Sequence, residues 1–141
     1  MRAKLTIRDY PIAEKRPELL EAEGGKAIAD LNLEAVESGA VTMEDLRITP
    51  LALGLQAEIA RDAGRPTLAD NFERAAELVE VPQDFIMEVY ELLRPGRAPS
   101  KAPLMDAARV LREVHGARRM AAFVEEAAEV YERRGLFRYR F

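Results

Sequence analysis

Few side chains in this chain of 141 residues could carry out covalent or acid–base chemistry. The chain has no cysteine, which excludes thiolate nucleophiles, disulfides and cysteine-ligated zinc or iron–sulfur sites. Its sole histidine, His115, could act as a general base only with a substrate proton and an orienting group within reach. The sequence identifies neither a substrate site nor an orienting residue for it. We therefore expect His115 to play a structural role in the last turn of a helix, where the helix dipole favours it.

Four glutamates near the C-terminus have a spacing that a metal site could use: Glu125, Glu126, Glu129 and Glu132. Glu126 and Glu129 lie three residues apart, as in helices of di-metal bundles, but such bundles also need a histidine on each of two facing helices. With one histidine in the chain, we predict a solvated acidic face instead, in which Arg133 supports Glu129. We predict no metal-binding residue.

Hydroxyl nucleophiles and phosphate-binding loops are not indicated either. Ser38 and Ser100 lie in turn contexts, outside G-x-S-x-G and S-x-x-K arrangements. The stretch Gly24-Gly25-Lys26 lacks the upstream glycine and the following Ser or Thr of a P-loop. The sequence therefore predicts no catalytic and no cofactor-binding residue.

Arginines mark places that could contact another macromolecule. The C-terminal stretch combines arginines with aromatic residues: Arg133, Arg134, Phe137, Arg138, Tyr139, Arg140 and Phe141. This composition could bind single-stranded nucleic acid, but it is also typical of protein interfaces, and the net charge of −4 argues against general binding to phosphates. The turns Gly64–Pro66 and Arg94–Arg97 could offer guanidinium groups to carboxylates of a partner or could be ordinary turns.

Helices are the elements that would position these side chains. Apolar residues recur at helical spacing in five segments bounded by caps and breakers, over roughly residues 50–63, 66–80, 83–93, 101–115 and 120–134. Thr49 and Ser100 are expected N-caps, and Gly135 an expected stop. The inward faces are predicted to include Leu51, Phe72, Val79 and Phe123. The sequence thus predicts an all-α fold, a small bundle of about five amphipathic helices.

Residues 1–48 differ from this helical part. Turn signals interrupt short apolar pieces, although Asn32 and Gly39 could begin and end one short helix, and Thr42 with Asp45 resembles a shortened capping box. A segment with so little periodic apolar surface could wrap its own domain or lie on another chain. We therefore predict an extended, loop-rich N-terminal arm over 1–48 that docks on a partner, a helical core domain over 49–135, and a basic and aromatic tail over 136–141.

No stretch approaches the ~20 apolar residues of a membrane span, and the N-terminus lacks the apolar core of a signal peptide, so we expect a soluble cytoplasmic protein without membrane contact. Two functional classes remain open from the residues alone. One is a helical adaptor that docks on larger partners; the other is a freestanding regulator that binds nucleic acid through its tail. An independent small enzyme would need a catalytic set that the sequence does not provide.

The order of residues adds a resemblance. Asp45 to Arg97 contains the phrases DLRITP, LQAEIA, DAGRP, RAAEL and YELLRPGR, and Met120 to Leu136 reads MAAFVEEAAEVYERRGL. Together with DYPIAEKRPEL and LNLEAVESGAVT upstream, these stretches resemble the small (gamma) subunit of coenzyme-B12-dependent diol and glycerol dehydratases. The similarity spans nearly the whole chain.

This resemblance implies a lyase complex that converts 1,2-diols, such as 1,2-propanediol and glycerol, to aldehydes and water. It implies a heterohexamer with two copies each of a large (alpha), a medium (beta) and a small subunit. Adenosylcobalamin would lie between the large and medium subunits, and the substrate would lie in the large subunit. The small subunit would be helical, pack on the large subunit and provide no catalytic group, and nucleic acid would have no part.

The sequence departs from that family's pattern in three places. Many members carry a longer N-terminal extension linked to packaging in bacterial microcompartments, whereas this chain starts almost at the arm, so we do not expect encapsulation through this subunit. Pro99 and Pro103 lie in and after the loop that begins at Arg94. The cysteine often found near the start of the last helix is absent around Arg119 and Met120.

Overall fold

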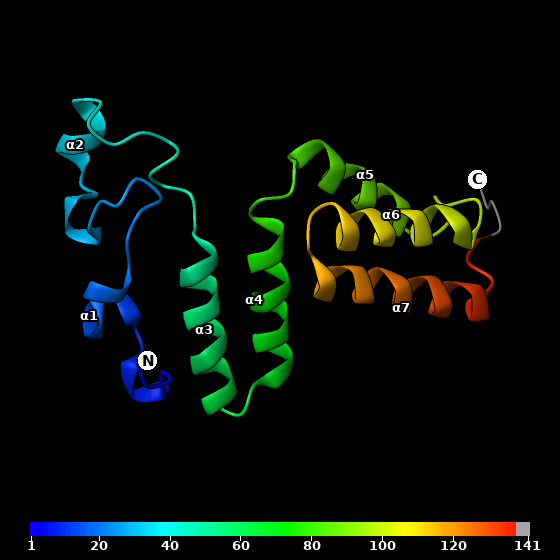
Figure 1. Cartoon of the computed structure of the whole chain (residues 1–141), viewed down its shortest axis with the longest axis horizontal. Helices are drawn as coiled ribbons and strands as arrows, with labels where there is room; N and C mark the ends of the chain where they lie inside the picture. Colours follow the sequence, from blue (N-terminus) through cyan, green and yellow to red (C-terminus); the bar gives the residue numbers. More distant parts are fainter. Residues whose placement is uncertain (138–141) are drawn as a thin grey trace. The chain divides into compact units, whose positions relative to one another are not determined.

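The computed structural model describes residues 1–137. Every regular element of secondary structure in this range is a helix (Figure 1). The only β-type pairing in this range is an isolated bridge between Glu21 and Ala27. The predicted all-α fold class is therefore confirmed. The chain forms two compact units, of which the first ends at Val79 and the second begins at Glu80.

The first unit is built on the antiparallel helices α3 (Pro50–Asp62) and α4 (Pro66–Leu78). The predicted cap is confirmed, because the Thr49 hydroxyl accepts a hydrogen bond of 3.1 Å from the backbone N–H of Ala52. Pro50 follows at the first helical position, where no N–H is needed. Small buried residues on the facing sides (Ala57, Ala60 and Ala69) let the two helices lie close together, and Leu68 and Phe72 pack against them.

The N-terminal segment of the first unit consists of short helical turns. They are η1 (Ile7–Asp9), α1 (Ile12–Lys15), η2 (Pro17–Leu19), η3 (Ile28–Asp30) and α2 (Leu33–Glu37). Leu5 and Ile12 form a buried cluster with Leu55 and Ile59 of α3. The first twenty residues therefore wrap their own unit, which was one of the two alternatives that the sequence left open.

The second unit contains α5 (Gln83–Leu93), α6 (Lys101–Glu113) and α7 (Arg118–Arg134). Six side chains of α6 and α7 are at most 1% exposed: Leu104, Ala108, Leu111, Ala121, Val124 and Ala128. Gly135 ends α7 in the left-handed conformation, with φ of 65°, and the N–H of Leu136 closes the turn onto the carbonyl of Tyr131 at 2.9 Å. The predicted stop is confirmed.

Several predicted details are wrong. Leu51 and Phe123 were expected to face inward but are 58% and 40% exposed, and Val79 is also exposed. Leu51 lies in the first turn of α3, whose buried residues begin at Leu53, and the buried stripe of α7 follows alanines and Val124 instead of Phe123. Ser100 occupies the N-cap position of α6, but its side chain makes no capping hydrogen bond.

Candidate partner-binding surface

His115 follows the C-terminal end of α6 and packs against an aromatic ring. The centroids of its imidazole and of the Phe85 ring on α5 lie 5.5 Å apart, with the planes tilted by 33°. The contact ties the end of α6 to α5. His115 thus lies just beyond α6 and not in its last turn, as the sequence had suggested, and its structural role stays a prediction.

The glutamates of α7 connect α7 to α6. Glu125 forms a paired contact with the Arg112 guanidinium, in which one N–O distance is 2.8 Å, and Glu129 lies 2.6 Å from the ammonium of Lys101. The hydrogen bond from Arg112 holds the pKa of Glu125 below its ordinary value. Glu129 lies on a solvated face as predicted, with its side chain 59% exposed, but the partner that the structure gives it is Lys101 and not Arg133, and Glu125 is half-buried against Arg112. Within residues 1–137 no group of three or more His, Cys, Asp or Glu side chains could hold a metal ion.

The serines and the glycine-rich stretch serve local structure. The Ser38 hydroxyl donates to the carbonyl of Ala35 at 3.2 Å, just after α2. The ammonium of Lys26 lies 3.0 Å from both carboxylate oxygens of Asp45. A Cβ at Gly24 would lie 2.9 Å from Oδ1 of the same carboxylate, so the loop approaches Asp45 too closely for a larger residue.

Asp45 is the charged hub of this region, and its residue is 6% exposed. Besides the Lys26 ammonium, its carboxylate accepts the backbone N–H of Thr42 at 3.0 Å, which is the second half of the predicted capping box. The Thr42 N–H and then the Lys26 ammonium keep the pKa of Asp45 below its ordinary value. Through Asp45 the loop at 21–27 is fixed to the turn at 42–46.

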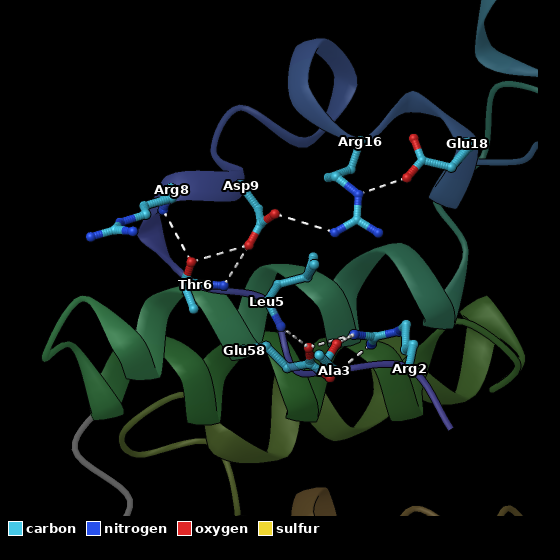
Figure 2. A network of polar contacts seen from close by, with 9 residues as sticks. All are labelled: Arg2, Ala3, Leu5, Thr6, Arg8, Asp9, Arg16, Glu18 and Glu58. Atoms are coloured by element: carbon cyan, nitrogen blue, oxygen red, sulfur yellow. Dashed lines mark hydrogen bonds and ion pairs between the residues drawn. The ribbon is translucent and has the colours of Figure 1, made fainter.

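A second carboxylate, Glu58 of α3, fixes the start of the chain (Figure 2). It accepts hydrogen bonds of 2.8 and 2.9 Å from the Arg2 guanidinium and of 2.8 Å from the backbone N–H of Leu5. Asp62, one turn further along α3, accepts the N–H of Ile7 at 2.8 Å. Arg2, followed by the Leu5 N–H, holds the pKa of Glu58 low. Residues 2–7 are thus strapped along α3.

A third network stabilises the turns that follow (Figure 2). Asp9 accepts the N–H of Thr6 at 2.8 Å and the Arg16 guanidinium at 3.3 Å, and Arg16 also pairs with Glu18 at 2.6 Å. The Thr6 N–H and then Arg16 lower the pKa of Asp9. Sequence reasoning missed Glu58 and Arg16, because their partners could be identified only from the folded path of the chain.

A pocket of about 750 Å³ lies beside the strapped N-terminus on α3. Its lining contains opposite charges that already pair, Arg2 with Glu58 and Arg61 with Glu73. This mixture of paired charges favours neither an anionic nor a cationic ligand, so the pocket does not indicate a small-molecule site.

Exposed apolar side chains are densest in the stretch from residue 33 to residue 51 of the first unit. Large side chains there with at least 45% exposure are Leu33, Val36, Met43, Leu46, Ile48 and Leu51. A smaller exposed group, Met87 and Tyr90, lies on α5. Exposed apolar side chains that gather in one region commonly mark contact with another protein.

The structure describes the arginines of the turn 94–97 and the first residues of the predicted tail. Arg94 pairs with Glu91 of α5 at 2.9 Å, and Arg97 lines a pocket beside α5. Phe137 packs edge-on against Tyr131, with centroids 6.2 Å apart. The rest of the predicted tail, residues 138–141, lies outside the described residues, so its proposed role in contacts stays a prediction. None of the helices in the described part of the chain is long and apolar enough to cross a membrane.

Comparison with known proteins gives a consistent result. A family described as dehydratase small subunit matches residues 5–138. The propanediol dehydratase small subunit of Citrobacter freundii is 52% identical over 128 residues, which cover 91% of this chain and 74% of that protein. The propanediol dehydratase small subunit of Salmonella typhimurium is 50% identical over 128 residues, covering 91% and 73%.

Proposed function

Because the chain belongs to the dehydratase small-subunit family, we propose that it is the non-catalytic small subunit of a coenzyme-B12-dependent diol dehydratase. The observation that carries the proposal is the match along residues 5–138, together with about 50% identity to two propanediol dehydratase small subunits. The complex would convert a 1,2-diol to an aldehyde and water. The names of these relatives favour 1,2-propanediol as the substrate, with glycerol as the second candidate.

The internal contacts of the chain support a structural role. Side chains that could do acid–base chemistry are engaged in holding helices and loops together: His115 with Phe85, Glu125 with Arg112, and Glu58 with Arg2. A group that must bind substrate or transfer a proton needs access to it. The proposal therefore assigns catalysis to the other subunits.

Adenosylcobalamin, the cofactor implied for the complex, would be bound by the larger subunits. Imidazole is the side chain of this protein best suited to ligate a transition metal such as cobalt. The only histidine lies against Phe85, so the residues described here do not fit that group. The contribution of this chain to the chemistry would be indirect, through assembly of the enzyme.

We place the chain in a cytoplasmic heterohexamer with two copies each of the large, medium and small subunits. The N-terminal arm over 1–48 is the proposed docking region. Since Leu5 and Ile12 are buried against α3, the later part of the arm is the part available for a partner.

Co-expression of this chain with the large and medium subunits tests the proposal. We expect the three chains to elute as one complex with equal copy numbers, and diol dehydration to fall when the small chain is omitted. A large and medium subunit pair that is fully active alone would contradict the structural role. Salt-sensitive binding of the isolated chain to single-stranded DNA or RNA would instead support a nucleic-acid regulator.

A further inference from the structure

Helix α2 (Leu33–Glu37) has no buried residue, which is unusual for a helix of a folded domain. Isolated helices shorter than about 12 residues are marginal in water, and most helical stability comes from packing of one face. Within this chain α2 is held by the Asn32 cap on Ala35 at 2.9 Å and by the N–H of Val41 on the Ala35 carbonyl at 3.0 Å. Figure 1 shows α2 apart from the α3–α4 pair. Its outer face lacks a packing partner within the first unit.

An exposed apolar helix face and a pocket lie close together in the sequence, although no side chain of α2 itself lines the pocket. Leu33 and Val36, spaced by three residues, share one helix face and are 72% and 45% exposed. Leu31, directly before the α2 cap, lines a pocket of about 200 Å³ together with Ile28, Leu46 and Ile48. Sites for drug-sized ligands measure about 300–1,000 Å³. A pocket of this size suits a single large apolar side chain better than a small molecule.

The segment from residue 20 to residue 48, which provides most of the pocket lining, is acidic. Seven carboxylates lie between residues 20 and 48, against the two basic residues Lys26 and Arg47, which already pair with Asp45 and Glu44. Five of the carboxylates form no ion pair within the described part of the chain: Glu21, Glu23, Asp30, Glu34 and Glu37. Glu34 and Glu37 lie on α2 itself, beside Leu33 and Val36.

These observations define the arm surface, which comprises the exposed residues Leu33, Val36, Met43, Leu46 and Ile48, the pocket that Leu46 and Ile48 line, and the unpaired carboxylates of the same segment, here called the acidic rim. We propose that the arm surface receives a basic element of a larger subunit of the dehydratase, which places one large apolar side chain in the pocket and arginine or lysine residues against the rim. The inference rests on the proposed function and names the chemistry of the partner. An apolar centre with a polar rim is the usual organisation of a protein interface.

Charge excludes two other occupants. In a symmetric pair of copies the same patch would meet itself, which would bring the carboxylates of Glu34 and Glu37 against like charges. Nucleic acid would face the same repulsion from its phosphates. A basic partner removes this repulsion.

Two variants of the full chain, each co-expressed with the large and medium subunits, test the inference. Leu46→Asp with Ile48→Asp puts charge into the pocket, and we expect at least a tenfold weaker association with the other subunits. Glu34→Lys with Glu37→Lys reverses the rim at exposed positions that bury nothing, and we expect several-fold weaker association. Association of the wild-type chain should also weaken as salt rises, because opposite charges at an interface are screened.

Val114→Asp is the matched control, since Val114 is a 69% exposed apolar residue of the second unit. It should assemble as the wild type does, and circular dichroism should show unchanged helix content for all variants. If the wild type assembles and both double variants assemble equally well, the inference is wrong while the proposed function stands. If the lysine variant binds more tightly, the partner is acidic and the inference is also wrong. If the wild-type chain fails to assemble, the proposed function itself fails.

Discussion

The α6–α7 pair and the segment between residues 20 and 48 are held together in opposite ways. The helix pair buries alanine, leucine and valine side chains almost completely, and its ion pairs lie at the edges of that core. The segment buries only Ala22, Val41 and Asp45, and it leaves five larger apolar side chains exposed: Leu33, Val36, Met43, Leu46 and Ile48. The pair buries a core of its own, whereas the segment has polar attachments to its own unit and an apolar surface that its unit leaves uncovered.

The largest expected effect is a difference in how much a truncated leucine destabilises the protein in each of the two regions. Leu111→Ala removes a side chain that is 1% exposed in the α6–α7 core and should lower the free energy of unfolding by about 2–5 kcal/mol. Leu46→Ala, at a 52% exposed position, should change it by less than about 0.5 kcal/mol. Urea denaturation measures both values, and similar losses at the two positions would break the comparison.

The next effect concerns the strap along α3. Glu58→Gln removes the charge that receives Arg2 and Leu5, so we expect a loss of about 1–3 kcal/mol in the first unit. Hydrogen exchange should accelerate at the amides of Leu5 and Ile7, while amides of α6 and α7 keep their protection. Glu14→Gln, at an exposed position, is the control. Faster exchange throughout the chain would show that the strap stabilises more than its own unit.

The smallest effect is a dependence on pH. The pKa values of Asp9, Asp45 and Glu58 are lowered by their hydrogen-bond donors in the folded chain. Their stabilisation is therefore fully present above the unfolded pKa values of about 4 and is lost as the pH falls through the lower folded values. Titration of stability below about pH 5 should show this decline. In Asp45→Asn it should be shallower, because the amide does not titrate.

The sequence predicted the helices well where local signals define both ends. Thr49-Pro50 begins α3, Pro66 begins α4, and Gly135 ends α7, each as expected from capping chemistry. Which face of each helix is buried was harder to predict. Phe123 and Leu51 fit the helical period, but burial depends on which neighbour covers each turn, and the period alone does not specify that neighbour.

The contacts that fix the N-terminal segment were largely beyond sequence reasoning. The hydrogen bond between Thr42 and Asp45 could be predicted as a capping pattern, because the two residues lie three apart in the sequence. The ion pair between Lys26 and Asp45 joins residues that are 19 apart in the sequence, and the pair between Arg2 and Glu58 joins residues that are 56 apart. Ion pairs over such separations leave no periodic trace in the sequence. The uncovered face of α2 could be recognised only after its surroundings were known.

The strap on α3 also sets an order of events during synthesis on the ribosome. Leu5 and the carboxylate that receives its N–H are 53 residues apart, so the first residues to emerge must wait for α3 to be made. At about 5–20 residues per second this delay lasts roughly 3–10 s. The α6–α7 pair, joined by a short turn from Val114 to Ala117, closes as soon as its second helix is available. The beginning of this chain therefore cannot become fixed before α3 has been made, although it emerges first.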